Sequence, residues 1–256
     1  MTALRDGTTQ EPPFLVVKEL TMRFGGICAL ADVSFDVAQG GITGLIGPNG
    51  AGKTTFFNCI TRLYHPTSGS VALGGDDLLR YPAHTIARRR IARTFQNVAL
   101  FAHMSVLENV LVGFHYRLGG TPGQRVNEAQ ARRESAEVLD YLTLGAVAGR
   151  PVHGLPFGTR KAVELARALV AKPELLLLDE PAAGLNHTEV EALGDRIARI
   201  SRDFGTTILM VEHHMGLVMG ISNHIVVLDS GRKLADGAPQ AIQRDPAVIE
   251  AYLGTT

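Results

Sequence analysis

Short apolar runs of three to five residues recur along the chain and alternate with longer segments of helical periodicity. Runs such as 175–178 are apolar at every position, which is typical of strands buried on both faces of a parallel sheet. The predicted strands are 14–17, 33–37, 42–46, 71–73, 175–178, 207–211 and 225–228. The predicted helices are about 53–63, 105–117, 127–143, 159–171, 188–204 and 239–252, with Pro246 splitting the last. This alternation predicts an α/β domain with a mostly parallel sheet.

The segment from about 86 to 165 contains few strand signals, so we expect a helical insertion into one α/β core. A cluster of helix breakers, Gly119-Gly120-Thr121-Pro122-Gly123, separates two of its helices. Residues 1–13 are polar and end in two prolines, which indicates a loose N-terminal leader. The expected organisation is therefore this leader followed by a single domain over 14–256.

Composition narrows the class of protein. The 256 residues carry 25 basic and 25 acidic side chains, and this balance argues against a nucleic-acid-binding protein with a broad basic surface. We find no apolar run of about 18 residues and no apolar segment near the start, so we expect neither a membrane span nor a secretory signal. Cys28 and Cys59 lack the spacing of metal ligands and are expected to be buried, reduced thiols of a cytosolic protein. The mean hydropathy of +0.10 indicates a surface that docks a partner.

A glycine-rich segment, Gly47-Pro48-Asn49-Gly50-Ala51-Gly52-Lys53-Thr54-Thr55, lies between a predicted strand and a predicted helix. It fits the pattern G-x-x-x-x-G-K-[ST] in the context that this pattern requires. Glycines let successive N–H groups point at phosphate oxygens, and the helix N-terminus adds further free N–H groups. Lys53 is expected to reach the β- and γ-phosphates, and the Thr54 hydroxyl is expected to bind Mg²⁺. The expected nucleotide-binding residues are Asn49, Gly50, Ala51, Gly52, Lys53, Thr54 and Thr55.

Two carboxylates, Asp179 and Glu180, follow the apolar run 175–178. Side chains at the carboxyl end of a parallel strand point toward the crevice in which open α/β sheets bind ligands. Asp179 suits the water shell of Mg²⁺, and Glu180 suits polarising the water that attacks the γ-phosphate. Such a pair often lies in a solvated loop without any further role. Downstream of a phosphate-binding loop, however, it indicates a hydrolytic site.

Two further residues suit phosphate chemistry. Gln96 lies where the helical insertion begins, and His213 follows the strand predicted at 207–211. A lone histidine at a strand end is more often a surface or packing residue. The neighbouring pair His213 and His214 also suggests a metal site, but we find no third ligand for one.

Taken in order, these motifs resemble those of the ATP-binding cassette (ABC) ATPases, over about residues 14–254. The resemblance implies a P-loop NTPase (RecA-like) core with a mostly parallel sheet, an antiparallel β subdomain and a helical insertion. It implies that Phe24 stacks on adenine and that Gly158 belongs to the signature segment, which contacts ATP on the opposite subunit. Gln96 would sense Mg²⁺ and the γ-phosphate, and His213 would position the γ-phosphate and water. ATP and Mg²⁺ are the implied cofactors.

The resemblance narrows to the ABC ATPases of branched-chain amino acid importers. The segments that carry it are 22–26, 93–97, 181–186, 211–213 and 248–254. It implies a subunit that hydrolyses ATP at the cytoplasmic face of the inner membrane. The implied partners are permease subunits, a second identical or sister cassette and, indirectly, a substrate-binding protein, with no nucleic acid.

Three positions depart from the wider family pattern. Pro156 stands where a serine is usual, and it has neither a hydroxyl nor an N–H group. We expect the contact with ATP on the opposite subunit to be retained but weakened. Asn186 replaces an aspartate, and His214 stands where an aspartate is expected after the histidine.

Alternatives stay open at this point. The solute could be urea, another amino acid or exported lipopolysaccharide, because the cassette does not touch it. A soluble ABC ATPase of repair or translation usually has two cassettes or a coiled-coil insert, and this chain has neither. A P-loop kinase would not account for the signature-like segment, the Asp-Glu pair and His213 together.

Overall fold

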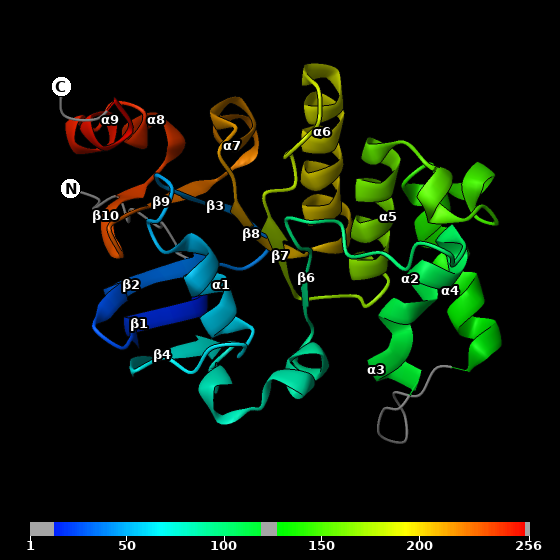
Figure 1. Ribbon diagram of the computed structural model, residues 1–256, viewed down its shortest axis with the longest axis horizontal. Helices are drawn as coiled ribbons and strands as arrows, with labels where there is room; N and C mark the ends of the chain where they lie inside the picture. The colour runs from blue at the N-terminus through cyan, green and yellow to red at the C-terminus, as the bar shows by residue number, and fades with distance from the viewer. Residues whose placement is uncertain (1–12, 119–126, 254–256) are drawn as a thin grey trace, which may run out of the picture.

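The computed structural model describes residues 13–118 and 127–253 (Figure 1). The cluster of helix breakers at 119–123 lies outside the described residues. So does the leader expected at 1–13, except for Pro13, which begins the first strand.

A six-stranded sheet forms the centre of the molecule, in the order β10-β9-β3-β8-β7-β6. Neighbouring strands are parallel except for β10, which pairs antiparallel with β9. The strands are β3 (Ile42–Ile46), β6 (Ile91–Arg93), β7 (Leu175–Asp179), β8 (Thr207–Val211), β9 (His224–Asp229) and β10 (Arg232–Gly237). The sequence pattern predicted neither β6 nor β10, because β6 has only three residues and β10 is an exposed, polar edge strand.

Both faces of this sheet are covered, which explains the unbroken apolar run of β7. Leu175 and Leu177 pack into a cluster with the smaller sheet and the helix that follows the glycine-rich loop. Leu176 and Leu178 point to the other face, into a cluster with the long helices. Alternate residues of a strand face opposite sides, so a strand covered on both sides is apolar at every position.

The smaller sheet is antiparallel, in the order β2-β1-β4-β5, and lies below β3 and β9 in Figure 1. Its strands are β1 (Pro13–Phe24), β2 (Ile27–Ala38), β4 (Ser68–Leu73) and β5 (Asp76–Asp77). The antiparallel subdomain expected from the family resemblance is thereby confirmed. Cys59 is buried in its core as expected, but Cys28 on β2 is only half-buried, and both thiols are free.

The helices follow the predicted pattern, with local differences. The α-helices are α1 (Lys53–Ile60), α2 (Val106–Leu111), α3 (His115–Leu118), α4 (Glu128–Tyr141), α5 (Phe157–Leu169), α6 (His187–Phe204), α7 (Met215–Ile221), α8 (Pro239–Ile242) and α9 (Pro246–Leu253). The helix expected at 105–117 is interrupted by a 3₁₀ turn, Val112–Phe114, and α7 was not predicted. The break expected at Pro246 separates α8 from α9.

The helical insertion lies to one side of the core. In Figure 1, α2, α3 and α4 lie beside α5, at the end of the molecule opposite α8 and α9. Helix α5 packs on both α2 and α4 and leads directly toward β7. It is therefore the element that joins the insertion to the sheet. No helix in the described ranges is long and apolar enough to cross a membrane.

Candidate active site

The glycine-rich loop turns between β3 and α1, and its backbone conformation requires glycine. Gly47 has φ +150°, and a Cβ there would lie 2.0 Å from the carbonyl oxygen of Leu228. Gly52 has φ +99°, and a Cβ there would lie 2.7 Å from the carbonyl oxygen of Ala29. The loop is thus held close to neighbouring backbone, with the predicted residues 49–52 on it and Thr54 and Thr55 in the first turn of α1.

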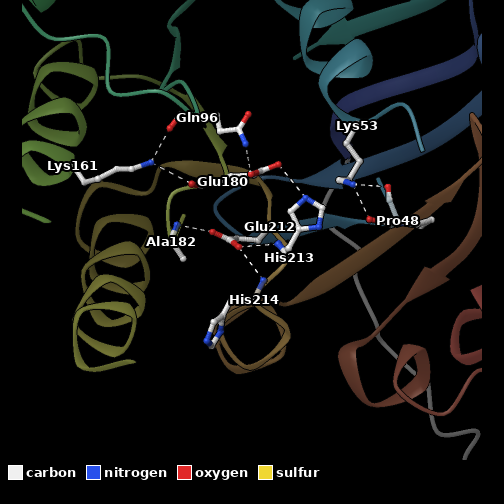
Figure 2. A network of polar contacts seen from close by, with 10 residues as sticks. Pro48, Lys53, Gln96, Lys161, Glu180, Ala182, Glu212, His213 and His214 are labelled. Atoms are coloured by element: carbon white, nitrogen blue, oxygen red, sulfur yellow. Dashed lines mark hydrogen bonds and ion pairs between the residues drawn. The ribbon is translucent and has the colours of Figure 1, made fainter. Parts of the chain in front are cut away.

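Lys53 is the buried cation of this loop. Its Nζ donates to the carbonyl oxygens of Gly47 and Pro48, at 2.7 and 2.9 Å (Figure 2). Burial lowers the pKa of Lys53, and the nearby carboxylates of Glu180 and Asp179 oppose this effect. The ammonium therefore sits against the loop that it would serve, close to two negative charges.

Three residues expected to be catalytic come together just beyond the end of β7. The Gln96 side-chain amide donates to Glu180 Oε2 at 2.7 Å, and His213 Nε2 lies 3.0 Å from Glu180 Oε1 (Figure 2). Glu180 has φ +45°, a left-handed backbone conformation that residues other than glycine rarely adopt. This backbone places the Glu180 carboxylate between Gln96, more than 80 residues earlier in the sequence, and His213, about 30 residues later.

Arg93, at the end of β6, holds the other carboxylate. Its Nη2 lies 2.7 Å from Asp179 Oδ2, and its Nη1 donates to Asn58 Oδ1 at 2.7 Å. Both side chains of this ion pair are more than nine-tenths buried. Sequence reasoning did not identify Arg93 as a site residue. Strand β6 was not predicted, and a charged residue after two apolar ones is typical of an exposed position.

Glu212, before the expected catalytic histidine, was also missed. It is buried, and its carboxylate accepts N–H groups from Ala182 at 2.6 Å, His213 at 2.8 Å and His214 at 3.0 Å (Figure 2). One carboxylate thus joins the turn after β7 to the turn after β8. The only sequence signal was a charged residue placed directly after the apolar run 208–211.

The structure explains two of the three departures from the family pattern. The His214 side chain accepts the N–H of Leu217 at 3.1 Å and caps the N-terminus of α7. Asn186 caps α6 in a capping box with Glu189. Both residues do what an aspartate would do at a helix N-terminus.

The other two predicted residues lie on separate elements. Phe24 ends β1, is 42% exposed, and meets the Tyr64 ring edge-to-face with centroids 5.1 Å apart. Gly158 lies in the first turn of α5, where a Cβ would lie 2.7 Å from Glu189 Oε1. Pro156 occupies the N-cap position of α5 and makes no side-chain capping bond.

Known protein families match this chain in two places. The ABC transporter family matches residues 30–183, and the branched-chain amino acid ATP-binding cassette transporter family matches residues 232–256. Of curated proteins, the high-affinity branched-chain amino acid transport ATP-binding protein BraF of Pseudomonas aeruginosa is 44% identical over 250 residues, covering 94% of this chain and 98% of BraF. The corresponding LivG protein of Salmonella typhimurium is 45% identical with the same coverage.

Solved structures agree with these matches. The ADP conformation of MJ1267, an ATP-binding cassette of an ABC transporter, is 29% identical with a TM-score of 0.85, covering 95% of this chain and 100% of that one. The dimeric structure of MJ0796, a bacterial ABC transporter cassette, is 26% identical with a TM-score of 0.76, covering 88% and 98%.

Proposed function

This chain belongs to the ABC transporter family, and on that premise we propose that it is the ATP-hydrolysing subunit of a branched-chain amino acid importer. The observation that supports hydrolysis is the Glu180 carboxylate held between Gln96 and His213, close to the phosphate-binding loop. The importer type is supported by the family match at 232–256 and by the identity to BraF and LivG over most of the chain.

Each side chain then has a separate task. The glycine-rich loop and the free N–H groups of α1 bind the phosphates, and Lys53 exchanges its bonds with loop carbonyls for bonds with phosphate oxygens. Glu180 accepts the proton of the attacking water. Gln96 and His213 fix the orientation of the Glu180 carboxylate, so that the water is held in line with the γ-phosphate.

The residues present also suit Mg²⁺. The oxygen donors are the Thr54 hydroxyl, the Asp179 carboxylate and the Gln96 side-chain carbonyl, which is the ligand type that this cation prefers. Arg93 engages Oδ2 of Asp179, and Glu180 engages the amide nitrogen of Gln96, so neither contact uses Asp179 Oδ1 or the Gln96 carbonyl oxygen. When bound, Mg²⁺ offsets the negative charge of the phosphates.

An apolar groove is the surface proposed for the permease. It has a volume of about 590 Å³ and runs between β6, the 3₁₀ turn at Val112–Phe114 and α5. Four of its lining side chains are large, apolar and more than a third exposed: Leu63, Phe95, Phe101 and Val112. A concave apolar surface of this kind is typical of a protein-binding site. Docking here would place the chain peripherally on the cytoplasmic face of the membrane.

The second proposed partner is another cassette, identical or a sister. The start of α5, with Gly158, has free N–H groups and no side-chain cap, which suits it to bind the phosphates of ATP held by the other cassette. ATP then holds the two cassettes together, and hydrolysis removes the γ-phosphate and releases them.

Glu180→Gln tests the proposed hydrolysis. We expect ATP affinity to stay within about twofold and turnover to fall at least about 100-fold, because the amide cannot accept the proton. The Glu180→Gln protein should also form a dimer with ATP that size-exclusion chromatography detects. The matched control is Glu191→Gln, at an exposed carboxylate on α6. Turnover by Glu180→Gln at the parent rate would refute the role of Glu180.

Transport by the assembled complex tests the proposed substrate. The chain is purified with candidate permease subunits from the same genome and placed in proteoliposomes with a candidate binding protein. We expect ATP-dependent uptake of labelled leucine, isoleucine and valine with the parent chain and none with Glu180→Gln. Uptake of urea in place of the amino acids, or ATP-driven movement of lipopolysaccharide, would contradict the assignment as a branched-chain amino acid importer while leaving hydrolysis intact.

A further inference from the structure

Three charged residues lie at a spacing of three along α5: Lys161, Glu164 and Arg167. This spacing places them along one side of the helix. Lys161 is 7% exposed and Glu164 is 2% exposed, while the Arg167 side chain is 16% exposed. Charged side chains are rarely buried unless they are paired, so this stripe must have partners.

The partners of the stripe are backbone groups of the segment 95–99, which contains Gln96. Glu164 Oε1 accepts the N–H of Phe95 at 3.2 Å. Arg167 Nη1 donates to the carbonyl oxygen of Ala99 at 2.6 Å. Because these bonds involve the main chain, they fix the path of the segment whatever its side chains are.

Lys161 makes the third contact with the segment 95–99 and also contacts the backbone of Glu180. Its Nζ donates to the carbonyl oxygen of Gln96 at 3.2 Å and to that of Glu180 at 3.3 Å (Figure 2). A single ammonium therefore bridges the main chains of two residues whose side chains meet 2.7 Å apart. Glu180 has a left-handed backbone, which needs such support from its surroundings.

We propose that Lys161 is a positioning residue for ATP hydrolysis, and that Lys161, Glu164 and Arg167 form a brace that makes the segment 95–99 move with α5. Lys161 holds Gln96 and Glu180 in register, so that the Gln96 amide orients the Glu180 carboxylate. This inference rests on the proposed hydrolysis and adds a rigid connection between α5 and the segment 95–99. Gly158 lies in the first turn of the same helix. A displacement of α5 when its N-terminus binds ATP on the second cassette is therefore transmitted to Gln96.

The test compares Lys161→Met, Lys161→Arg and the control Lys172→Met in the full-length chain. Lys172 also holds a carboxylate, that of Glu134, but it is exposed and takes no part in the brace. We expect Lys161→Met to lower the turnover number at least tenfold and to leave the ATP dissociation constant within twofold. Lys161→Arg keeps a cation with several donors and is expected to lose less than threefold. Lys172→Met is expected to keep the parent turnover.

Two further measurements separate positioning from a general loss of structure. Hydrogen–deuterium exchange of the amides at 95–99 should rise in Lys161→Met and stay at the parent level in Lys172→Met. In a double-mutant cycle with Gln96→Ala, the Lys161→Met effect on turnover should be smaller than in the parent, because the Gln96 amide is gone and only the support of the Glu180 backbone is still lost.

The outcomes are distinguishable from failure of the proposed function. If the parent chain does not hydrolyse ATP, the proposed function itself is wrong. If the parent hydrolyses ATP and Lys161→Met turns over at the same rate, or if the two effects multiply in the cycle, the brace is refuted. If Lys161→Met does not fold, Glu164→Gln decides, because it replaces the charged acceptor of the Phe95 N–H by a neutral, weaker one. Unchanged exchange at 95–99 in Glu164→Gln would then refute the brace.

Discussion

Pro156 shows how one residue can act on both stability and partner contact. It occupies the N-cap of α5, supplies no capping bond and has no N–H group. A serine there could accept an N–H from its own helix and donate its hydroxyl to a phosphate, because a hydroxyl both donates and accepts.

Pro156→Ser should therefore gain in two ways. Capping is worth about 1 kcal/mol, which raises the thermal midpoint by about 2–4 °C. An added hydrogen bond to a charged phosphate is worth about 1.5–3 kcal/mol, so ATP-driven dimerisation in a Glu180→Gln background should tighten roughly tenfold or more. Calorimetry and analytical ultracentrifugation measure the two effects. Pro156→Ala removes the ring without adding a hydroxyl and should tighten the dimer little. Equal dimerisation by Pro156→Ser and the parent would contradict the prediction.

The glycine-rich loop, which the sequence identified by its local pattern, differs from the residues that the sequence missed in the range of its contacts. Lys53 and its loop are local, since one strand, one turn and one helix create the cradle. Arg93, Glu212 and Lys161 act through partners that lie at least 19 residues away, apart from Glu212's bonds to its two neighbours. No periodic pattern carries that information. Only the fold shows why these charged residues are buried.

At the scale of elements, Glu134 ties α4 to the core. Burial by itself would raise the pKa of Glu134, but side-chain hydrogen bonds from Arg117, Lys172 and Gln130 outweigh it and lower the pKa to about 2. The salt bridges to Arg117 and Lys172 measure 2.8 and 2.9 Å. Residues from α3, from the loop after α5 and from α4 itself thus converge on one carboxylate.

Glu134→Gln should lower stability in a pH-dependent way. A carboxyl whose folded pKa lies below its unfolded value of 4.5 contributes stability above that value and loses it as the pH falls toward about 2. The urea midpoint of Glu134→Gln should therefore lie below that of the parent by an amount equivalent to about 1–3 kcal/mol at pH 7. The gap should stay constant from about pH 8 to 6 and narrow below about pH 5. A gap that did not narrow on acidification would show that packing, and not charge, is responsible. Glu137→Gln, on the same helix, is the control.

Elements were predictable where burial was strong and regular. Strand β7, apolar up to Asp179, and the long amphipathic α6 lie within two residues of their predicted ranges. Strand β6 was missed because three residues cannot show a period, and its identity comes from pairing with β7. Helix α7 was missed because it has seven residues, includes two glycines and is stabilised by the His214 cap and by packing on α6.

At the scale of the whole molecule, the chain has zero net charge and a positive mean hydropathy, and the structure shows where part of the exposed apolar surface lies. Four of the large exposed apolar side chains gather in the groove between β6 and α5. The groove shares Phe95 and Arg167 with the brace, so a permease segment seated there would touch the same backbone that α5 holds. This shared segment would link the proposed docking to the proposed hydrolysis.

Phe101→Ser tests the groove without touching the polar network of the site. Phe101 is 51% exposed, and aromatic side chains at the centre of an interface contribute about 2 kcal/mol or more, which corresponds to roughly 30-fold in affinity. We expect co-purification with the permease and permease-stimulated turnover to be lost. The matched control is Phe204→Ser, since Phe204 is 50% exposed but lies at the end of α6, outside the groove. ATP binding by each isolated variant reports on its folding. Permease binding by Phe101→Ser at the parent level would place the docking surface elsewhere. Equal loss of binding in both variants would show a general apolar attraction and not a specific groove.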